Sequence, residues 1–262
     1  MHHDVAIVGA GFAGSILART LVQRGMSVVL FDRQHHPRFA LGESTTPLAN
    51  FALERLAARY GLPDLHQLAT HGRWLRHHPD LRRGLKRGFS FFWHRPGRPY
   101  ENDEANHHRL LVAASPDDER ADSHWLRSDV DHHLLRQAQA EGVKVYNGAG
   151  VSRLEIAPHQ VAIHAELDGR TRRFTASRLV DGSGPRGVLA RAVAAEAHPP
   201  SAVLGGLSTT LIYGHLEGAR PSSKRPASRV SSCSPGPIPT TGRRSITCWR
   251  RAGSTPYRST TG

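Results

Sequence analysis

The chain has 262 residues and a formal net charge of +13, from 35 Lys and Arg against 22 Asp and Glu. Nine of the bases and none of the acids fall in residues 220–262, so the first 219 residues carry 26 bases against 22 acids. This distribution argues against a nucleic-acid-binding domain, and two cysteines, Cys233 and Cys248, are too few for a disulfide framework. No apolar run approaches the roughly 20 residues that span a bilayer, and the start, MHHD, lacks signal-peptide features. We therefore expect a cytoplasmic protein without membrane or nucleic-acid partners.

A strand–helix–strand pattern with a glycine fingerprint occupies residues 4–32. Residues 5–8 and 28–31 are short apolar runs, typical of parallel strands that are buried on both faces. Between them, Gly9-Ala10-Gly11-Phe12-Ala13-Gly14 has G-x-G-x-x-G spacing and leads into a helical pattern that ends at Gly25. Asp32 ends the second strand, where its carboxylate can accept hydrogen bonds from a ribose diol. The pattern predicts a dinucleotide site but does not distinguish FAD from NAD.

Each residue of the fingerprint has a physical purpose. Gly9 permits the tight turn, Gly11 allows a pyrophosphate to approach the backbone, and Gly14 lets the helix pack close to the strand. The amino end of the helix offers free N–H groups and a positive dipole to the phosphates. Arg33, next to Asp32, could lie near the adenosine end of the cofactor.

The middle of the chain alternates polar turns with apolar segments. Residues 42–47, GESTTP, form a polar turn, and Pro47 begins a helix with Thr46 as its N-cap and Gly61 as its end. The expected apolar face of that helix is Leu48, Phe51, Leu53, Leu56 and Ala57. Residues 85–93 are rich in aromatic side chains and are expected to form one strand. We expect loops over 94–107 and 114–124, and a strand over 110–113.

The next segments predict a helix followed by strands. Ser128 is a candidate N-cap for a helix that ends at Gly142. Strands are expected over 143–146 and 178–181, the latter entering a glycine-rich turn, and over 207–213. An antiparallel meander is expected over 151–156, 160–167 and 171–175. The histidine pairs at 35–36, 77–78, 107–108 and 132–133 lack metal-ligand spacing, so we predict surface histidines and no metal site.

Five motifs together resemble a known family. They are the fingerprint, GESTTP at 42–47, the aromatic stretch after Lys86, Arg127 opening a helix, and VDGSGPRG at 180–187. In this order they resemble the FAD-dependent halogenases of the tryptophan-halogenase type and, more broadly, the group A flavin monooxygenases. The match covers roughly residues 4–215. It implies an α/β, glutathione-reductase-like FAD/NAD(P)-binding Rossmann fold with an inserted β-sheet substrate domain.

The resemblance also implies a domain division and a set of cofactor-binding residues. The FAD-binding domain would comprise 1–84 and 126–200, and the partial substrate-domain sheet 85–125 and 201–217. Gly9 to Gly14 and Asp32 would hold the ADP half of FAD. Glu43 and Ser44 would lie near the flavin, and Arg127 would reach the cofactor. Other contacts are expected from Asp181 and from the N–H groups of the turn containing Gly182, Gly184 and Gly187.

Lys86-Arg87-Gly88 resembles the K-x-G element in which the lysine of these halogenases faces the substrate. The implied reaction uses FADH2 supplied by a separate flavin reductase, oxygen, and a chloride or bromide ion as co-substrate. Lys86, as a haloamine or through hydrogen-bonded hypohalous acid, would then halogenate a small aromatic substrate. This role needs a dry aromatic pocket. The alternatives are a solvent-exposed lysine at a strand end and an FAD hydroxylase of the group A type.

The composition changes at about residue 218. Residues 218–262 are rich in Arg, Ser, Thr, Pro and Gly and lack apolar periodicity, which is typical of disorder. Back-translation of residues 234–262 with GC-rich codons and reading in another frame yields a peptide containing GWLYTLP. This heptapeptide resembles the tryptophan-halogenase signature G-W-x-W-x-I-P. We therefore predict a frameshift near residues 217–222, which would make this chain a fragment that lacks the true carboxyl-terminal substrate domain.

Overall fold

The computed structural model describes residues 2–95, 97–101, 103–113, 115–184 and 187–193. The strand expected at 207–213, the substrate-domain segment 201–217 and the predicted frameshift lie outside these residues. The described helices are α1 (Phe12–Val22), α2 (Pro47–Tyr60), α3 (Pro63–Leu68), α4 (His71–His77), α5 (Arg127–Ala140) and α6 (Val188–Val193). The described strands are β1 (His2–Val8), β2 (Val28–Asp32), β3 (Arg83–Lys86), β4 (Gly88–Phe92), β5 (Arg109–Ala113), β6 (Asp122–Trp125), β7 (Lys144–Asn147), β8 (Gly150–Ala157), β9 (Gln160–Leu167) and β10 (Arg170–Asp181).

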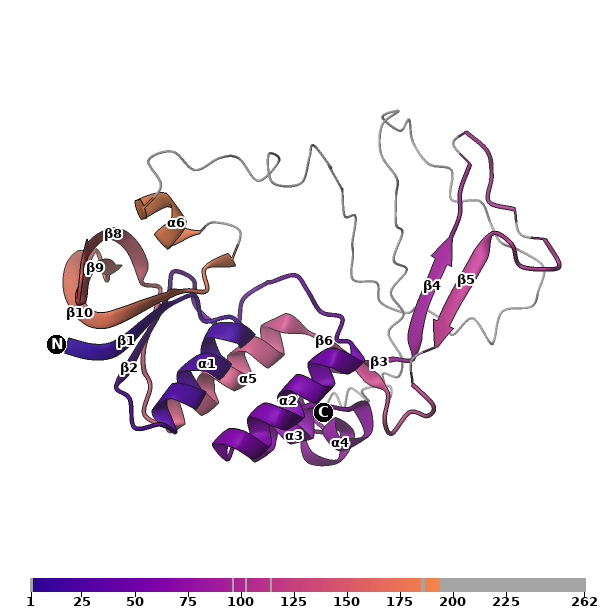
Figure 1. Cartoon of the computed structure of the whole chain (residues 1–262), viewed down its shortest axis with the longest axis horizontal. Coiled ribbons are helices and arrows are strands. Elements are labelled where there is room, and N and C mark those ends of the chain that lie inside the picture. Colours follow the sequence, from indigo (N-terminus) through magenta and orange to yellow (C-terminus); the bar gives the residue numbers. More distant parts are fainter. Residues whose placement is uncertain (1, 96, 102, 114, 185–186, 194–262) are drawn as a thin grey trace, which may run out of the picture.

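The main sheet has the strand order β7-β2-β1-β10-β9-β8 (Figure 1). Strand β1 pairs in parallel with β2 and β10, and β2 pairs in parallel with β7. Strands β8, β9 and β10 form the expected antiparallel meander, with Asp168 and Gly169 at positive φ in its turn. The predicted α/β fold class is confirmed.

Alternate residues of β1 and β2 belong to two hydrophobic cores. Val5, Ile7, Val28 and Leu30 pack with residues of α1 and α5 on one face. Ala6, Val29 and Phe31 pack with Ile163 and Phe174 of the meander on the other. Because the strands are buried on both faces, they read as continuous apolar runs, as predicted.

Strand β10 is a single strand of 12 residues, where we expected separate strands at 171–175 and 178–181. Its first part pairs with β9, up to Ala176 opposite Val161, and its second part pairs with β1, from Thr175 opposite His2. This pairing places Asp181 opposite Val8, directly before the glycine turn. The two expected strands are therefore one element that belongs to both halves of the sheet.

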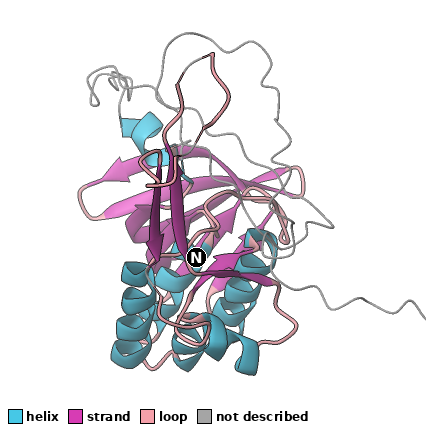
Figure 2. Ribbon diagram, turned by 90° about the vertical axis from the view of Figure 1, so that its right-hand side faces the viewer, coloured by secondary structure: helices cyan, strands magenta, loops and turns pink. Residues whose placement is uncertain are grey.

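Helices α1 to α5, labelled in Figure 1, lie in the lower part of the view in Figure 2, below most of the strands. Thr46 caps α2 by accepting a hydrogen bond from the Ala49 N–H at 3.4 Å, and Gly61 ends it in the left-handed conformation, both as expected. The predicted apolar face of α2 is partly wrong. Leu53 and Ala57 are buried, whereas Leu48 and Phe51 are 75% and 54% exposed.

The aromatic segment 85–93 is not one strand. It divides at Arg87 into β3, which pairs with β6, and β4, which pairs with β5 in a separate two-stranded sheet. The expected strand at 110–113 is confirmed as part of β5. The predicted loop at 114–124 ends early, because β6 begins at Asp122 and its pairing with β3 gives this polar segment a partner.

The predicted N-cap at Ser128 is wrong. Helix α5 begins at Arg127, and its N-cap Leu126 supplies no side-chain hydrogen bond. The Ser128 hydroxyl instead contacts the Asp129 carboxylate at 3.0 Å. Within the described ranges the longest helices, α2 and α5, have 14 residues each, and none is long and apolar enough to cross a bilayer.

Candidate functional site

Two positions of the glycine turn after β1, Gly9 and Gly14, are too crowded for a side chain. Gly9 has a φ of +107°, and a Cβ on it would lie 2.2 Å from the carbonyl oxygen of Gly182. A Cβ on Gly14 would lie 2.0 Å from the Gly9 carbonyl oxygen. Both positions therefore require glycine, one for the turn against β10 and the other for the close approach of α1 to β1.

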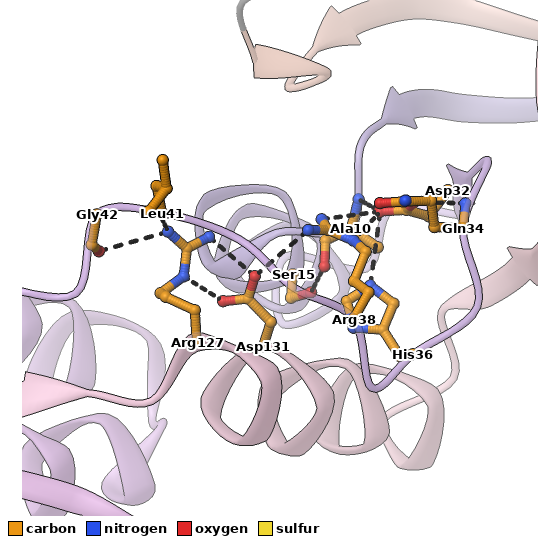
Figure 3. Close-up of polar contacts among 10 residues, drawn as sticks. All are labelled: Ala10, Ser15, Asp32, Gln34, His36, Arg38, Leu41, Gly42, Arg127 and Asp131. Carbon is orange, nitrogen blue, oxygen red and sulfur yellow. Dashed lines mark hydrogen bonds and ion pairs between the residues drawn. The ribbon is translucent and has the colours of Figure 1, made fainter. Parts of the chain in front are cut away.

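Asp32 closes β2 and faces this turn (Figure 3). Its carboxylate accepts hydrogen bonds from the backbone N–H groups of Ala10 and Gln34, both at 2.9 Å, and pairs with Arg38 at 3.0 Å. Burial favours the neutral acid, but hydrogen bonds from His36 and Gln34 and the charge of Arg38 outweigh it and lower the pKa. Asp32 is therefore a carboxylate, as recognition of a ribose diol requires.

Two arginines lie close to Gly11, and Figure 3 shows both of them beside Asp131. A Cβ on Gly11 would be 3.5 Å from Nη2 of Arg127 and 3.7 Å from Nη2 of Arg38. Arg127 binds Asp131 through two hydrogen bonds of 2.8 Å, and Arg38 lies 3.9 Å from the same carboxylate. The two guanidinium groups thus place positive charge beside the position where the fingerprint predicts a pyrophosphate.

The residues present fit the ADP part of FAD. Helix α1 starts after Gly11, and this N-cap residue makes no side-chain hydrogen bond to the first-turn N–H groups. These donors, the missing Cβ of Gly11 and the guanidinium groups of Arg127 and Arg38 suit an anionic diphosphate. The intervening Ala10, Phe12 and Ala13 shape this turn, with Phe12 lying 4.6 Å below the Arg127 guanidinium.

The turn after β10 is arranged differently from the expectation. Gly182 donates its N–H to the Val8 carbonyl at 2.7 Å, and Gly187 donates to the Gly184 carbonyl at 3.1 Å. Asp181 accepts from the Ser183 N–H at 2.9 Å and from the Leu189 N–H at 2.8 Å. Burial opposes ionisation of Asp181, but these hydrogen bonds lower its pKa. In this arrangement Asp181 organises the turn, and the Gly182 and Gly187 N–H groups are already bonded.

Arg33 is exposed, and the arginine that contacts Asp32 is Arg38. Sequence reasoning missed Arg38, Asp131, Asp122 and Asn50. Asp131 could have been found from its spacing, because it lies four residues after Arg127 on the predicted helix. Arg38 follows a loop whose path no periodicity predicts.

Glu43 and Ser44 belong to a segment that lies along β6. The Trp125 N–H donates to the Glu43 carbonyl at 2.7 Å, and Ser44 forms an antiparallel bridge with His124. The Thr45 hydroxyl makes two hydrogen bonds with the Ser123 backbone. It donates to the Ser123 carbonyl at 2.8 Å and accepts from the Ser123 N–H at 3.0 Å. The polar turn predicted at 42–47 is thus tied to β6, next to β3.

Lys86, the last residue of β3, is buried. Its side chain is 2% exposed, and Nζ donates a hydrogen bond to the Thr45 carbonyl. Nζ also lies 3.5 Å from an Asp122 carboxylate oxygen and 3.9 Å from the centroid of the Phe89 ring. Burial lowers the pKa of Lys86, and the Asp122 charge opposes that shift. The alternative of a solvent-exposed lysine is therefore wrong, while its catalytic role remains a prediction.

Comparison with known proteins places these features in a family. The model of the family described as "FAD dependent oxidoreductase" matches residues 4–231. The monodechloroaminopyrrolnitrin halogenase PrnC of Pseudomonas fluorescens is 30% identical over 220 residues, covering 84% of this chain and 37% of that protein. The tetracycline 7-halogenase of Kitasatospora aureofaciens is 32% identical over 199 residues, covering 75% of this chain and 34% of that protein. This chain spans about a third of the length of these relatives.

A solved structure has the same fold. The crystal structure of halogenase PltM in complex with phloroglucinol and FAD superposes with a TM-score of 0.63 at 26% identity, over 72% of this chain and 36% of that chain. The resemblance to flavin-dependent halogenases that the motifs predict is thus confirmed. The chain belongs to the FAD dependent oxidoreductase family.

Proposed function

We propose that this chain is the FAD-binding and lysine-bearing part of a flavin-dependent halogenase. The observation that carries the proposal is a short segment, residues 41–45, that touches both candidate sites. The Leu41 and Gly42 carbonyls accept hydrogen bonds from Arg127, and the Thr45 carbonyl accepts one from Lys86. The segment joins the arginine beside the nucleotide turn to the buried amine.

In this proposal the ADP half of FAD lies over Gly11, with its ribose toward Asp32. Arg127 and Arg38 would face the diphosphate while they keep their carboxylate partners Asp131 and Asp32. The segment containing Glu43 and Ser44 would lie beside the flavin. Bound as FADH2, the cofactor supplies the reducing equivalents with which oxygen and a halide ion yield hypohalous acid.

Lys86 would direct the halogen to the substrate. Its burial keeps water away from Nζ, and the Phe89 ring gives the lysine an aromatic neighbour. From this position Nζ could hold hypohalous acid by a hydrogen bond, or carry the halogen as a haloamine, while an electron-rich aromatic carbon attacks it. Small aromatic substrates, a halide ion and a separate flavin reductase are therefore the proposed partners.

The domain division is part of the same proposal. Residues 85–125 would belong to the substrate-facing sheet, and 1–84 with 126–200 to the FAD-binding domain. The β4–β5 pair supports this division, because apolar side chains on both of its strands are at least 38% exposed: Phe91, Phe92, Leu110, Leu111 and Val112. An apolar patch of this kind is typical of a surface that another part of the protein covers.

The test has two stages. Sequencing the gene past codon 215 establishes the reading frame of the full protein. The product of that frame is then incubated with FAD, a flavin reductase, NADH, oxygen and bromide, together with a panel of phenols and indoles. We expect brominated products, recognised by mass spectrometry from the bromine isotope pair. Products that are only hydroxylated would show a monooxygenase and overturn the proposal.

A further inference from the structure

Lys86 and Asp122 face each other across the β3–β6 pair. They are direct partners in the antiparallel register, and both side chains are 2% exposed. Because both groups are withdrawn from water, neither is stable as a charge without the other. The pair thus needs further hydrogen bonds from its surroundings.

Asn50 of α2 provides one of these bonds. Its amide Nδ2 donates to Oδ1 of Asp122 at 2.8 Å, which leaves Oδ2 directed toward Lys86 at 3.5 Å. The amide thereby fixes the rotation of the carboxylate. Helix α2, which begins directly after the segment that touches Lys86, is therefore also connected to the opposite member of the pair.

The groups around Nζ are all electron-rich. They are the Thr45 carbonyl oxygen, the Asp122 carboxylate and the face of the Phe89 ring. An ammonium group can direct N–H bonds to all three, whereas the lone pair of a free amine would face one of them unfavourably. The arrangement is complementary to the protonated form of Lys86.

We propose that Asp122, oriented by Asn50, is a positioning residue that holds Lys86 as an ammonium at the junction of β3 and β4. Lys86 then acts on hypohalous acid as a hydrogen-bond donor through the N–H that faces the Phe89 ring. Asp122 and the Thr45 carbonyl keep the other two N–H bonds. The haloamine alternative is disfavoured. The consequence for halogen transfer rests on the proposed function, whereas the pairing itself does not.

In the part of the chain that the structure describes, one other titratable group, His124, interacts with this pair. His124 lies two residues after Asp122 on β6, and burial, with a smaller effect from the Lys86 charge, lowers its pKa to about 4. His124 is therefore neutral near pH 7. Burial acts on the pair in opposite directions, lowering the pKa of Lys86 and raising that of Asp122, while their mutual attraction opposes both shifts.

The chain allows a direct measurement, because it contains only three lysines: Lys86, Lys144 and Lys224. The full chain would be labelled with ¹³C,¹⁵N-lysine, and the Nζ signals followed by NMR as the pH is raised. Lys86→Arg assigns the signal. We expect an ammonium signal for Lys86 at pH 7. In the Asp122→Asn variant the titration midpoint of Lys86 should fall by about one to three pH units, which is the usual effect of an opposite charge at hydrogen-bonding distance.

Asp118→Asn is the matched control. Asp118 lies four residues before Asp122 and pairs with Arg87, the residue next to Lys86, at the exposed surface. This variant should leave the Lys86 midpoint unchanged, and Asp122→Glu should recover part of the wild-type value. A folded Asp122→Asn protein with an unchanged Lys86 midpoint would overturn the proposal.

If circular dichroism shows that Asp122→Asn is unfolded, the unmodified chain still provides a test. Labelling with ¹³C-aspartate as well follows the Asp122 carboxyl carbon. Protonation of Asp122 should move the Lys86 Nζ signal at the same pH. If the Lys86 signal does not respond to the protonation of Asp122, or if Lys86 is uncharged at pH 7, the pairing is refuted. None of these readouts depends on halogenase activity, so a failure of the proposed function would be seen separately.

Discussion

Arg127 and Asp131, one turn apart at the start of α5, form a buried ion pair with two parallel hydrogen bonds of 2.8 Å. Asp131 is fully buried, and the remaining Arg127 nitrogen bonds to carbonyls of Leu41 and Gly42. The pair thus holds a guanidinium group over Gly11 and fixes the segment that leads toward Lys86. This geometry connects helix stability with the nucleotide site.

Arg127→Met should therefore impair both stability and cofactor binding. It leaves the Asp131 carboxylate without its main partner in the interior, which costs about 3–5 kcal/mol of unfolding free energy. It also removes the positive charge beside Gly11, so affinity for FAD should fall. Urea unfolding measures the first effect, and quenching of flavin fluorescence on titration measures the second.

Arg82→Met is the control for this change. Arg82 pairs with Asp129 on the same helix, but its side chain is 61% exposed, so its loss should cost at most about 1 kcal/mol. FAD affinity should be unchanged in this variant. Equal losses of affinity in the two variants would mean that general destabilisation, rather than the position of Arg127, explains the effect.

Gly14→Ala tests the close packing of α1 on β1. The new Cβ would lie 2.0 Å from the Gly9 carbonyl oxygen, so the helix must shift. We expect a loss of about 3 kcal/mol from overpacking, together with loss of FAD binding, because the shift moves the helix amino end. Gly61→Ala is the comparison, since its Cβ has no neighbour within 4 Å and only the left-handed backbone is strained, at about 1 kcal/mol. Urea unfolding measures both losses. If Gly14→Ala and Gly61→Ala lose similar unfolding free energy, the steric explanation for Gly14 is wrong.

Residues 4–32 could be read from sequence because each feature there depends on local pattern. The apolar runs, the glycine spacing and Asp32 lie in one continuous unit. The α/β class followed from that unit. The division of 85–93 at Arg87 could not be read in the same way, because it depends on which strands β3 and β4 find as partners far along the chain.

The same limit applies to the candidate site. Lys86 was found from a short motif. Its partner Asp122 lies 36 residues later in the chain, and Asn50, which binds Asp122, lies 36 residues before Lys86. Pairing of β3 with β6 brings Asp122 to Lys86, and the packing of α2 brings Asn50 to Asp122. Pairing between strands that are distant in the chain produces no periodic pattern of residues. The sequence therefore predicts the lysine but not the carboxylate that neutralises it.

His124 should make stability depend on pH below neutrality. Burial lowers its pKa to about 4 from 6.5, so the unfolded chain binds the proton more tightly. Its contribution is fully present above about pH 6.5 and is lost as the pH falls from 6.5 toward 4, by roughly 2–3 kcal/mol. His124→Phe should retain more of its unfolding free energy between pH 8 and pH 5 than the wild type does. Urea unfolding at the two pH values measures this loss of unfolding free energy. If the variant and the wild type lose the same amount, His124 is not the group responsible.

Lys86→Met should separate binding of FAD from halogen transfer. Lys86 contacts Thr45, Asp122 and Phe89, none of which belongs to the glycine turn. Flavin fluorescence titration should therefore give wild-type affinity, while the full-frame protein should form no brominated product. The variant also leaves Asp122 as an unpaired buried carboxylate, which costs about 3–5 kcal/mol. Lys144→Met, at an exposed position of β7, should preserve both stability and bromination.

The double variant Lys86→Met, Asp122→Leu separates the loss of chemistry from the loss of stability. Replacing both members of a buried ion pair with apolar residues of similar size is often neutral or stabilising, so its unfolding free energy should return to within about 1 kcal/mol of the wild type. Asn50 then loses its acceptor, which accounts for a remaining deficit of about that size. If this restored protein binds FAD and still forms no brominated product, the missing function is the amine of Lys86. Recovery of bromination would instead show that Lys86 contributes only to stability.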